Sequence, residues 1–462
     1  MPHEVEVLVA GAGAAGCAAA LAAAQAGLDV VLIEAEEHFR SGCNTSMSTS
    51  MVPAGGSRWQ DALGVDDSPE QFRADIFRKT RGAADPVLAA ALTDVAPQLV
   101  AWMNDDCDVP LDLVTDFLYP GHTRHRCHSV NDRAGATMHS HLLAAVARSP
   151  KITMAVPMRM NTLVESPDPA GGWVVSMGDA KETVTATNVI LATSGFGGDR
   201  GLVSQYLPEI ADGLYFGGES SNGLAMRLAG SLSADTAFLD AYQGHGSVAV
   251  PMQVLLTWAS IVHGGFMVNA VGERFGNEST GYSEFGSLVM RQPGGEAWVI
   301  YDRRIHELLI PFKDYRDILD QGGPKWVDDA AALATLIGAS TEALDRTLQE
   351  ANDAAQGRRA CPQGRTNWGE ALSGPLAVQR VTGALFHTQG GMYVDGQARV
   401  RRNGEPLAGL YAAGGAAHGI SGHGADGYLA GNGLLGALGL GLIAGRDAAK
   451  ATDPACGSGE TQ

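Results

Sequence analysis

The sequence predicts an α/β protein in which a doubly wound, Rossmann-like domain is interrupted by a second, α+β domain. Three observations predict this architecture. A strand–glycine–helix–strand pattern occupies residues 5–34. A strand–glycine–helix pattern returns after about residue 369. Residues 237–368 instead show strands that alternate with amphipathic helices. We therefore expect one domain formed by residues 1–236 and 369–462, with residues 237–368 as the inserted domain.

The N-terminal elements form a β-α-β unit. Val5–Ala10 is a short buried strand, an alanine-rich helix extends to about Ala26, and Val30–Ile33 is a second apolar strand. Further elements are expected as helices over 69–103, short strands over 151–190, a central strand from 189 that runs into a glycine turn at 195, and a last helix that begins near 431–433.

Composition excludes several classes of function. The chain has 462 residues, 45% of them hydrophobic, and a formal net charge of −19, which argues against nucleic acid or an anionic membrane surface as the main partner. The longest apolar stretch, Gly433–Gly445, is too short and too rich in glycine to span a bilayer. Glu4 and Glu6 stand where a signal peptide needs an apolar core, so we expect a cytoplasmic protein.

The six cysteines give no metal or cluster motif. They stand at 17, 43, 107, 127, 361 and 456, and no two form a CxxC pair. This spacing argues against a zinc ribbon, an iron–sulfur cluster and a covalently attached haem. We expect free thiols and no bound metal.

A dinucleotide-binding motif lies between the first strand and the first helix. Gly11 permits a tight turn, Gly13 lets the backbone approach a pyrophosphate, and Gly16 lets helix and strand pack closely. The helix N-terminus offers N–H groups to phosphate oxygens, and Glu34, at the end of the second strand, can bind a ribose hydroxyl. A second GxGxxG begins at Gly431, but it lacks a preceding strand and a following acid. We therefore expect one dinucleotide and no NAD(P)H domain.

Several motifs together resemble a known family. They are the glycine motif with Glu34, and the segments at 41–45, 190–198, 267–278, 386–391 and 409–414. Over nearly its whole length the chain resembles the superfamily of FAD-dependent fumarate reductases and 3-ketosteroid dehydrogenases. The resemblance implies a GR2-type flavoprotein fold, in which an FAD-binding domain carries a mobile capping domain and the substrate is held between them against the flavin.

The resemblance and the glycine motif imply a set of residues that contact FAD. They are Gly11, Gly13, Ala14, Ala15, Gly16, Glu34, Ala35, Gly42, Cys43, Asn44, Thr45, Thr193, Ser194, Gly195, Asn222, Gly414, Asn432, Gly433, Leu434 and Leu435. The helix that begins near Gly433 is expected to direct its N-terminus at the flavin ring. At Gly415 the family often has a glutamate that contacts the ribityl chain, so that contact is not expected here.

The substrate residues implied by the resemblance are of two kinds. Tyr282 stands four residues beyond Asn277-Glu278, where fumarate reductases have an arginine and ketosteroid dehydrogenases a catalytic tyrosine. Tyr428, with the backbone N–H of Gly433, matches the pair that polarises a ketone in the steroid enzymes, although its spacing is one residue longer. His387 matches instead a histidine that binds a substrate carboxylate in fumarate reductases.

A loop at 121–128 adds two arginines and three histidines, which suit a carboxylate ligand. We expect Arg126 to contribute to carboxylate binding and Tyr119, or a histidine of this loop, to relay a proton. Arg274 lies in a turn that resembles a structural motif of the family, so we expect it to be structural.

These residues predict an FAD enzyme that desaturates a ketone at its α,β carbon–carbon bond. Tyr428 and Gly433 would stabilise the enolate, Tyr282 would remove the α-proton, and the hydride would pass to the flavin. A small cyclic ketone or ketoacid such as 4-oxocyclohexanecarboxylate would suit the site, with oxygen, a quinone or an electron carrier as the external acceptor. Two alternatives stay open: a fumarate- or urocanate-type reductase of an unsaturated carboxylate, and a noncatalytic flavoprotein subunit.

The segment 41–47 contains no histidine, whereas succinate dehydrogenases link FAD covalently to a histidine in this loop. We therefore predict noncovalent FAD. The purified protein should be yellow, and acid precipitation should leave the flavin in the supernatant. Flavin that stays with the precipitated polypeptide would contradict this prediction.

Overall fold

A computed structural model describes residues 4–169, 171–179 and 181–452, and the chain divides into two compact units. Unit 1 comprises residues up to 207 together with 217–242 and the segment from 387 onward, whereas unit 2 comprises 208–216 and 243–386. The inserted unit thus ends at residue 386 and not at the expected 368. The reason is the strand β17 (Leu376–Thr388), most of which pairs within the sheet of unit 2.

Unit 1 contains the predicted parallel sheet. Its strands follow the order β19-β20-β9-β1-β2-β6, and β1 lies between β2 and β9, parallel to both. The strands are β1 (Glu4–Ala10), β2 (Val30–Ile33), β6 (Ile152–Ala155), β7 (Met160–Glu165), β8 (Trp173–Met177), β9 (Glu182–Leu191), β19 (Arg399–Arg402) and β20 (Glu405–Ala412). The β-α-β unit, the strand at 189–191 and the fold class are therefore confirmed.

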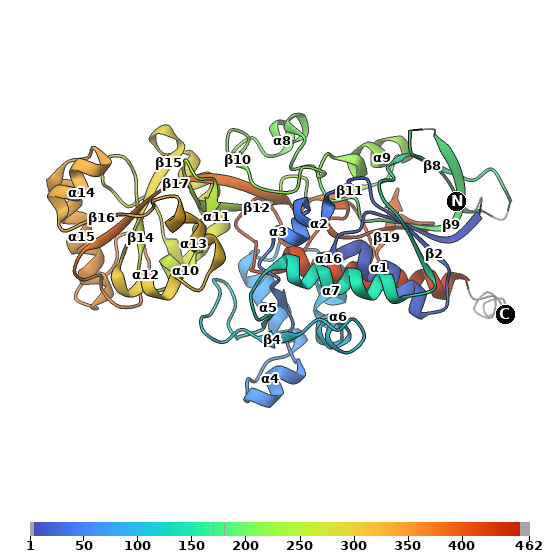
Figure 1. The fold of residues 1–462 in the computed structure, drawn as a ribbon, viewed down its shortest axis with the longest axis horizontal. Coiled ribbons are helices and arrows are strands. Elements are labelled where there is room, and N and C mark those ends of the chain that lie inside the picture. Colours follow the sequence, from blue (N-terminus) through green and yellow to red (C-terminus); the bar gives the residue numbers. More distant parts are fainter. Residues whose placement is uncertain (1–3, 170, 180, 453–462) are drawn as a thin grey trace. The chain divides into compact units, whose positions relative to one another are not determined.

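The helices of unit 1 are α1 (Ala14–Gln25), α2 (Phe39–Gly42), α3 (Asn44–Met47), α4 (Arg58–Leu63), α5 (Pro69–Lys79), α6 (Pro86–Asp105), α7 (Gly135–Arg148), α8 (Arg200–Tyr206), α9 (Leu224–Leu232) and α16 (Asn432–Thr452). Among these helices, α1, α7 and α16 lie beside the parallel sheet, whereas α4, α5 and α6 lie farther from it (Figure 1). A small sheet of β3 (Val52–Pro53), β4 (Leu111–Leu113) and β5 (Cys127–Val130), and a β11 (Thr236–Ala237) to β18 (Gly391–Met392) pair, complete the unit.

The helical pattern predicted over 69–103 is divided in two. Helix α5 ends at Lys79, and α6 begins after Asp85, whose carboxylate accepts a hydrogen bond from the N–H of Leu88. By length and hydropathy α6 could cross a membrane, but half of its apolar window is buried inside the protein. Its buried side, which includes Leu92 and Leu99, belongs to the core of unit 1.

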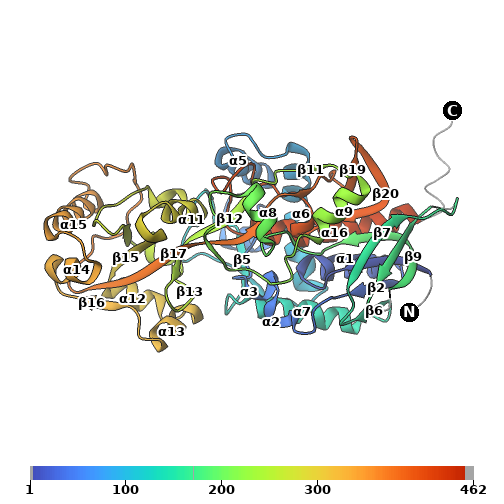
Figure 2. The same cartoon turned by 90° about the horizontal axis from the view of Figure 1, so that it is seen from above.

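Unit 2 is built on a second sheet, with β17 as its long strand (Figure 2). The strands are β10 (Leu214–Tyr215), β12 (Tyr242–Ala249), β13 (Val254–Leu255), β14 (Phe266–Val268), β15 (Glu296–Asp302), β16 (Lys325–Val327) and β17. The helices are α10 (Ala259–Val262), α11 (Tyr282–Met290), α12 (Arg303–Leu309), α13 (Lys313–Asp320), α14 (Ala330–Ile337) and α15 (Thr341–Ala355). Strand β10 pairs with β17, which explains why residues 208–216 belong to this unit.

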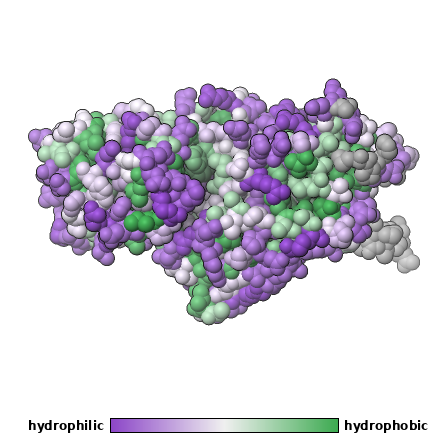
Figure 3. Space-filling model, in the orientation of Figure 1, coloured by the Kyte–Doolittle hydropathy of each residue, from purple (hydrophilic) through white to green (hydrophobic). Residues whose placement is uncertain are grey.

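The surface mixes hydrophilic and hydrophobic atoms on the face seen in Figure 3. One group of hydrophobic atoms lies over the end of α4, where Leu63 is 62% exposed. Isolated exposed leucines are common on protein surfaces, so this feature does not by itself mark a binding site.

Helices α1 and α16 lie side by side in unit 1 and approach closely because glycines of α16 face the backbone of α1 (Figure 1). A Cβ atom added at Gly441 would stand 2.3 Å from the carbonyl oxygen of Ala15, and one at Gly445 would stand 2.4 Å from that of Ala19. These backbone atoms cannot move aside independently, so the two helices can keep this distance only with glycine at both positions.

We predict that Gly441→Ala lowers the free energy of unfolding by ~1–3 kcal/mol, the usual cost of overpacking. The matched control is Gly230→Ala in α9, where an added Cβ meets nothing within 4 Å. Alanine should be neutral there or stabilise the helix by up to ~1 kcal/mol. Urea unfolding measures both variants, and equal stabilities would contradict the proposed close packing.

Candidate active site

The predicted FAD-contact residues gather at one edge of the parallel sheet. Strands β1, β2, β9 and β20 run parallel, and the predicted residues follow their carboxyl ends at 11–16, 34–35, 193–195 and 414. In open α/β sheets, ligands bind beyond the carboxyl ends of the strands. The N-terminal end of α16, at Asn432, adds residues 432–435 from unit 1.

The glycine motif forms the tight turn that the sequence predicts. Gly11 has a φ of +105°, and an added Cβ there would stand 2.3 Å from the carbonyl oxygen of Ala192. At Gly16 an added Cβ would stand 1.7 Å from the carbonyl oxygen of Gly11. Glycine is therefore required at both positions for the tight turn itself, which places the N-terminus of α1 at the carboxyl end of β1, where a pyrophosphate can bind.

Glu34 lies at the end of β2 and is 8% exposed. Its carboxylate accepts hydrogen bonds from the backbone N–H groups of Ala12, at 2.8 Å, and of Glu36, at 2.9 Å. These bonds fix the carboxylate against the glycine turn. An ionised carboxylate has about four acceptor positions, so it can still accept ribose hydroxyl groups.

The segment at 42–45 is joined to the same turn. Thr45 Oγ1 accepts a hydrogen bond from the N–H of Ala14 at 2.9 Å. Asn44 Nδ2 donates to Ser194 Oγ at 3.1 Å and to Ser221 Oγ at 3.2 Å. These hydrogen bonds connect the loops that follow β1, β2 and β9 with one another at the carboxyl edge of the sheet.

Two buried polar side chains support the presence of a ligand here. Both side-chain polar atoms of Asn432, and Oγ1 of Thr193, are buried without a hydrogen-bond partner in the part of the chain that the structure describes. Such groups normally find a partner, because an unpaired buried polar group costs ~1–3 kcal/mol. The polar atoms of FAD can supply these partners, so the residues present fit this cofactor.

The structure adds local contacts at Asn222, a predicted FAD contact, and at Gly415, where no contact was expected. Asn222 Oδ1 accepts a hydrogen bond from the N–H of Leu224 at 3.1 Å, which favours a role at the start of α9. At Gly415 an added Cβ would stand 2.6 Å from the backbone nitrogen of Gly195. No glutamate fits at that position, which explains the departure from the family pattern.

The structure brings Tyr428, Gly433 and His387 together within unit 1. The N–H of Gly433 lies 3.3 Å from the hydroxyl oxygen of Tyr428 and donates to it. The rings of His387 and Tyr428 meet edge to face, with 5.6 Å between centroids. A Cβ added at Gly433 would stand 2.8 Å from the Nε2 atom of His387, so all three groups surround one point.

Burial keeps both side chains of this cluster neutral. It raises the pKa of Tyr428 well above its usual value and lowers the pKa of His387 to about 4. Tyr428 is therefore a hydrogen-bond donor and not a base near neutral pH. Without a ligand, His387 is a neutral imidazole and not the charged donor that the sequence suggests.

Gln389, which the sequence analysis did not single out, orients His387. Its Nε2 lies 3.2 Å from Nδ1 of His387, while its Oε1 accepts a hydrogen bond from Ser421 at 2.9 Å. Because the serine engages the oxygen end, the NH₂ end of the amide faces the histidine. The same Nδ1 lies 3.3 Å from the carbonyl oxygen of Thr388, so the ring is held from this side while Nε2 lies next to Gly433.

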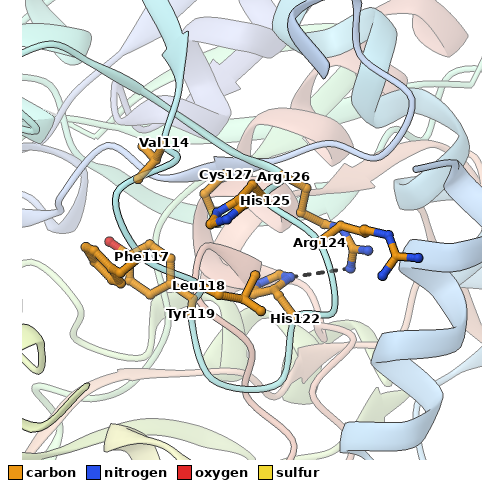
Figure 4. A pocket seen from close by; sticks show the side chains of 9 residues that line it. All are labelled: Val114, Phe117, Leu118, Tyr119, His122, Arg124, His125, Arg126 and Cys127. Carbon is orange, nitrogen blue, oxygen red and sulfur yellow. Dashed lines mark hydrogen bonds between the residues drawn. The ribbon is translucent and has the colours of Figure 1, made fainter. Parts of the chain in front are cut away.

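The loop at 121–128 forms part of a small hollow of about 160 Å³ (Figure 4). It is lined by Val114, Phe117, Leu118, Tyr119, His122, Arg124, His125, Arg126 and Cys127. Burial raises the pKa of Tyr119 far above its usual value and lowers that of His122 to about 4. Both groups therefore stay neutral at pH 7, so Tyr119 is a poor base for the predicted relay.

Arg126 is fully buried and bound to two aspartates. Its Nε lies 2.9 Å from Asp67 and its Nη1 lies 2.6 Å from Asp75, and none of these side chains is more than 2% exposed. Burial would raise the pKa of Asp75, but hydrogen bonds from Thr123 and the charge of Arg126 lower it overall. The geometry therefore favours a structural role for Arg126 over the carboxylate binding that the sequence predicts.

Tyr282 begins helix α11 in unit 2. Its ring stacks on His245, with 4.8 Å between centroids and planes 18° apart, and Trp258 meets it edge-on. The Nδ1 atom of His245 lies 3.2 Å from both the N–H and the hydroxyl group of Ser247, and burial lowers the histidine pKa to about 3. The tyrosine thus packs against a neutral aromatic partner.

A buried ion network fixes the chain just before Tyr282. Glu278 pairs with Arg274 and lies 3.5 Å from Arg365, and all three side chains are at most 4% exposed. Glu278 Oε1 also accepts the N–H of Met267 at 3.3 Å. The prediction that Arg274 is structural agrees with these contacts.

Sequence reasoning missed the partners that orient these groups. Asp67 and Asp75 carry no motif, and their importance depends on Arg126, more than fifty residues later. Gln389 stands in the matching segment 386–391, but its contact with Ser421 could not be anticipated from that segment. Among the described cysteines, 17, 43, 107, 127 and 361 are free thiols, and Cys456 lies outside the described residues.

Residues 6–434 match the family described as an FAD binding domain. The chain belongs to this family. It is an FAD-dependent oxidoreductase of the superfamily that contains fumarate reductases and 3-ketosteroid dehydrogenases. The glycine turn, Glu34 and Asn432 are therefore the residues that would hold the FAD.

Relatives of known activity fall into more than one group. The fumarate reductase (cytochrome) of Shewanella frigidimarina is 28% identical over 458 residues, which cover 97% of this chain and 78% of that protein. The urocanate reductase of Eggerthella lenta is 25% identical over 443 residues, which cover 89% of this chain and 69% of that protein.

Solved structures show the same fold. An open conformation of a flavocytochrome c3 fumarate reductase aligns with a TM-score of 0.78 and 27% identity, covering 98% of this chain and 79% of that one. The 3-ketosteroid-Δ4-(5α)-dehydrogenase of Rhodococcus jostii RHA1 aligns with a TM-score of 0.75 and 24% identity, covering 97% of each chain.

We predict that Arg126→Ala destabilises the protein by ~3–5 kcal/mol, because it removes the described ion pair of the buried Asp67 and leaves Asp75 with only the half-exposed Arg78. The matched control is Arg124→Ala in the same loop, whose exposed side chain bonds only backbone oxygens in the described structure. It should change stability by no more than ~0.5 kcal/mol. Urea unfolding checks both variants, and a normally stable Arg126→Ala with impaired substrate binding would restore the original interpretation.

Proposed function

We propose that this chain desaturates a small ketone at the carbon–carbon bond next to its carbonyl group. One observation carries the proposal: the hydroxyl of Tyr428 and the N–H of Gly433 lie 3.3 Å apart beside His387. In the described structure this N–H donates to the hydroxyl oxygen, and the carbonyl oxygen of a bound ketone would take its place as the acceptor of the N–H while also accepting from the hydroxyl. No carboxylate or arginine partner is needed for that interaction.

These donors would act on the charge that develops during reaction. Removal of an α-proton moves negative charge onto the carbonyl oxygen, and each donor lowers the energy of that enolate. Loss of one such donor typically costs ~3–4 kcal/mol of transition-state stabilisation. The raised pKa of Tyr428 supports this role, because the phenol keeps its proton and stays a donor.

FAD supplies the acceptor for the hydride that leaves the β-carbon. The chain supplies position and proton transfer, and the proposal assigns removal of the α-proton to Tyr282. An unperturbed tyrosine titrates near pKa 10, so this step needs a local reduction of that pKa or a rapid relay. Reducing equivalents would then leave to an external acceptor such as oxygen, a quinone or an electron carrier.

His387 supports a substrate with a second polar group. Its Nε2 lies next to Gly433, while its Nδ1 is held by Gln389 and the carbonyl oxygen of Thr388. A neutral N–H can donate to a carboxylate, and the bound anion would raise the histidine pKa. A cyclic ketoacid such as 4-oxocyclohexanecarboxylate offers both a ketone and a carboxylate.

A second candidate is reduction of an unsaturated carboxylate, which the similarity to fumarate and urocanate reductases favours. The two candidates differ in which compound changes the flavin. A ketone should bleach the oxidised flavin under anaerobic conditions, whereas fumarate or urocanate should reoxidise the reduced flavin. A flavin that responds to neither group of compounds would indicate a noncatalytic flavoprotein.

We predict that Tyr282→Phe slows anaerobic bleaching by a ketone substrate ~100- to 10,000-fold, the usual effect of losing a general base. Tyr428→Phe should slow it ~100- to 1,000-fold, because one enolate donor is lost. Stopped-flow absorbance of the flavin measures both rates. FAD content should be unchanged, since phenylalanine keeps the ring volume at each position.

Tyr206→Phe, at the end of α8, is the matched control, because the ring contact described for it is with Phe196 and not with Tyr428, Gly433 or His387. It should bleach at the parent rate. Near-normal bleaching in Tyr282→Phe would remove Tyr282 from the mechanism. Near-normal bleaching in Tyr428→Phe would contradict the proposed role of the Tyr428 hydroxyl, on which the proposed function depends.

A further inference from the structure

The thiol of Cys43 and the imidazole of His139 form a pair next to the glycine turn at residues 11–16. Neither residue belongs to the cluster of Tyr428, Gly433 and His387. Cys43 Sγ lies 3.7 Å from Nδ1 of His139, and Nε2 of His139 lies 2.8 Å from the carbonyl oxygen of Ala12. Cys43 lies at the start of α3 and is partly exposed, while His139 is buried on α7. Both residues belong to unit 1.

The carbonyl of Ala12 determines which ring nitrogen can act as a base. A carbonyl oxygen only accepts, so Nε2 of His139 must carry a proton. In the neutral ring Nδ1 is then unprotonated and faces the thiol. The Cys43 thiol therefore contacts the His139 ring, and the ring is oriented by the carbonyl oxygen of Ala12. A nucleophile, its base and a group that orients the base form the arrangement that activates cysteine in nucleophilic enzymes.

The electrostatics agree with this geometry. Burial raises the pKa of Cys43, but hydrogen bonding to His139, its charge and Ser46 outweigh this and lower the value to about 7. Burial likewise lowers the pKa of His139, but contacts with the thiols of Cys17 and Cys43 raise it overall. Cys107 and Cys127 differ, because burial raises the pKa of each to about 12.

We propose that Cys43 is a modification site of this protein, at which peroxides and other soft electrophiles react with a thiolate activated by His139. With a peroxide, the sulfur forms an S–O bond as the O–O bond breaks. The departing hydroxide takes the proton of the His139 imidazolium to give water and a cysteine sulfenic acid. Sulfur loses two electrons and the peroxide gains them; a thiol reductant reverses the change.

The position of Cys43 couples its modification to the cofactor. Asn44 Oδ1 accepts the N–H of Gly218 at 2.6 Å, and Thr45 Oγ1 accepts the N–H of Ala14 at the start of α1. An adduct on Cys43 displaces these neighbours, because an ordinary packed segment has little spare volume. Modification should therefore weaken FAD binding.

The experiment uses the FAD-loaded protein with Cys361 and Cys456 replaced by serine, which leaves the thiols at 17, 43, 107 and 127. Iodoacetamide, at limiting concentration, labels it between pH 5 and 10, and peptide mass spectrometry follows each cysteine. Cys43 should react at least ~10-fold faster than Cys107 and Cys127 at pH 7, because only its thiolate is substantially populated. The rate should rise with a midpoint near pH 7.

His139→Gln tests the role of the base, since an amide can still donate to Ala12 but cannot take the thiol proton. The midpoint should move toward pH ~8.5, the value of a free cysteine. The rate at pH 7 falls only a few-fold, because a less acidic thiol gives a more nucleophilic thiolate. The midpoint is therefore the decisive readout, and a purely structural role of His139 would not move it.

Hydrogen peroxide replaces iodoacetamide in a second arm, with dimedone to trap sulfenic acid. Trapping at Cys43 with release of FAD supports the proposal, and Cys43→Ser should abolish both. Labelling of Cys43 no faster than Cys107, or a parent midpoint at pH 8.5 or above, overturns it even if His139→Gln does not fold. Flavin that stays bound after complete labelling overturns the coupling to FAD.

Discussion

The tight turn between β1 and α1 is the constraint on which the candidate site depends. Only glycine fits at 11 and 16, because a Cβ atom at either position would overlap a backbone oxygen. The same turn presents the N–H of Ala12 to Glu34 and its carbonyl oxygen to His139. One backbone conformation therefore opens the pyrophosphate site, fixes the ribose acid and orients the base of a nearby thiol.

The residues around Tyr428 work through neutral hydrogen bonds and not through charge. Burial keeps Tyr428 and His387 uncharged at neutral pH, and the N–H of Gly433 carries no formal charge. Neutral donors in a buried site suit a carbonyl oxygen that becomes an enolate, since they need little reorganisation as the charge develops. A dicarboxylate would bring two full charges into the same surroundings, which arginines are better suited to hold.

Buried ion pairs in both units serve to hold segments in place. In unit 1, Arg126 connects Asp67 with Asp75, while in unit 2 Glu278 gathers Arg274 and Arg365. Such pairs give modest net stability, yet removing one member leaves a buried charge uncompensated. The stability from Asp75 is present above its unfolded pKa of ~3.9 and is lost as pH falls through its lower folded value.

The sequence by itself determined the fold class and the cofactor, and it predicts the residues nearest to that cofactor. Strand and helix periods are local, and the glycine motif followed by Glu34 describes a single turn whose chemistry needs no distant partner. The pairing of Tyr428 with Gly433 could also be anticipated, because they are only five residues apart and α16 begins between them, at Asn432.

Only the tertiary structure decided the roles of Arg126, Gln389 and His139, and the end of the inserted unit. Arg126 looked like a ligand for carboxylates because its loop is rich in arginine and histidine, but its partners Asp67 and Asp75 lie more than fifty residues earlier. The same holds for Cys43 and His139, which are 96 residues apart. Whether a charged or titratable group binds a ligand or a neighbouring side chain depends on which partner the fold brings within hydrogen-bond distance. Local sequence patterns do not predict the distance between two side chains that are far apart in the chain.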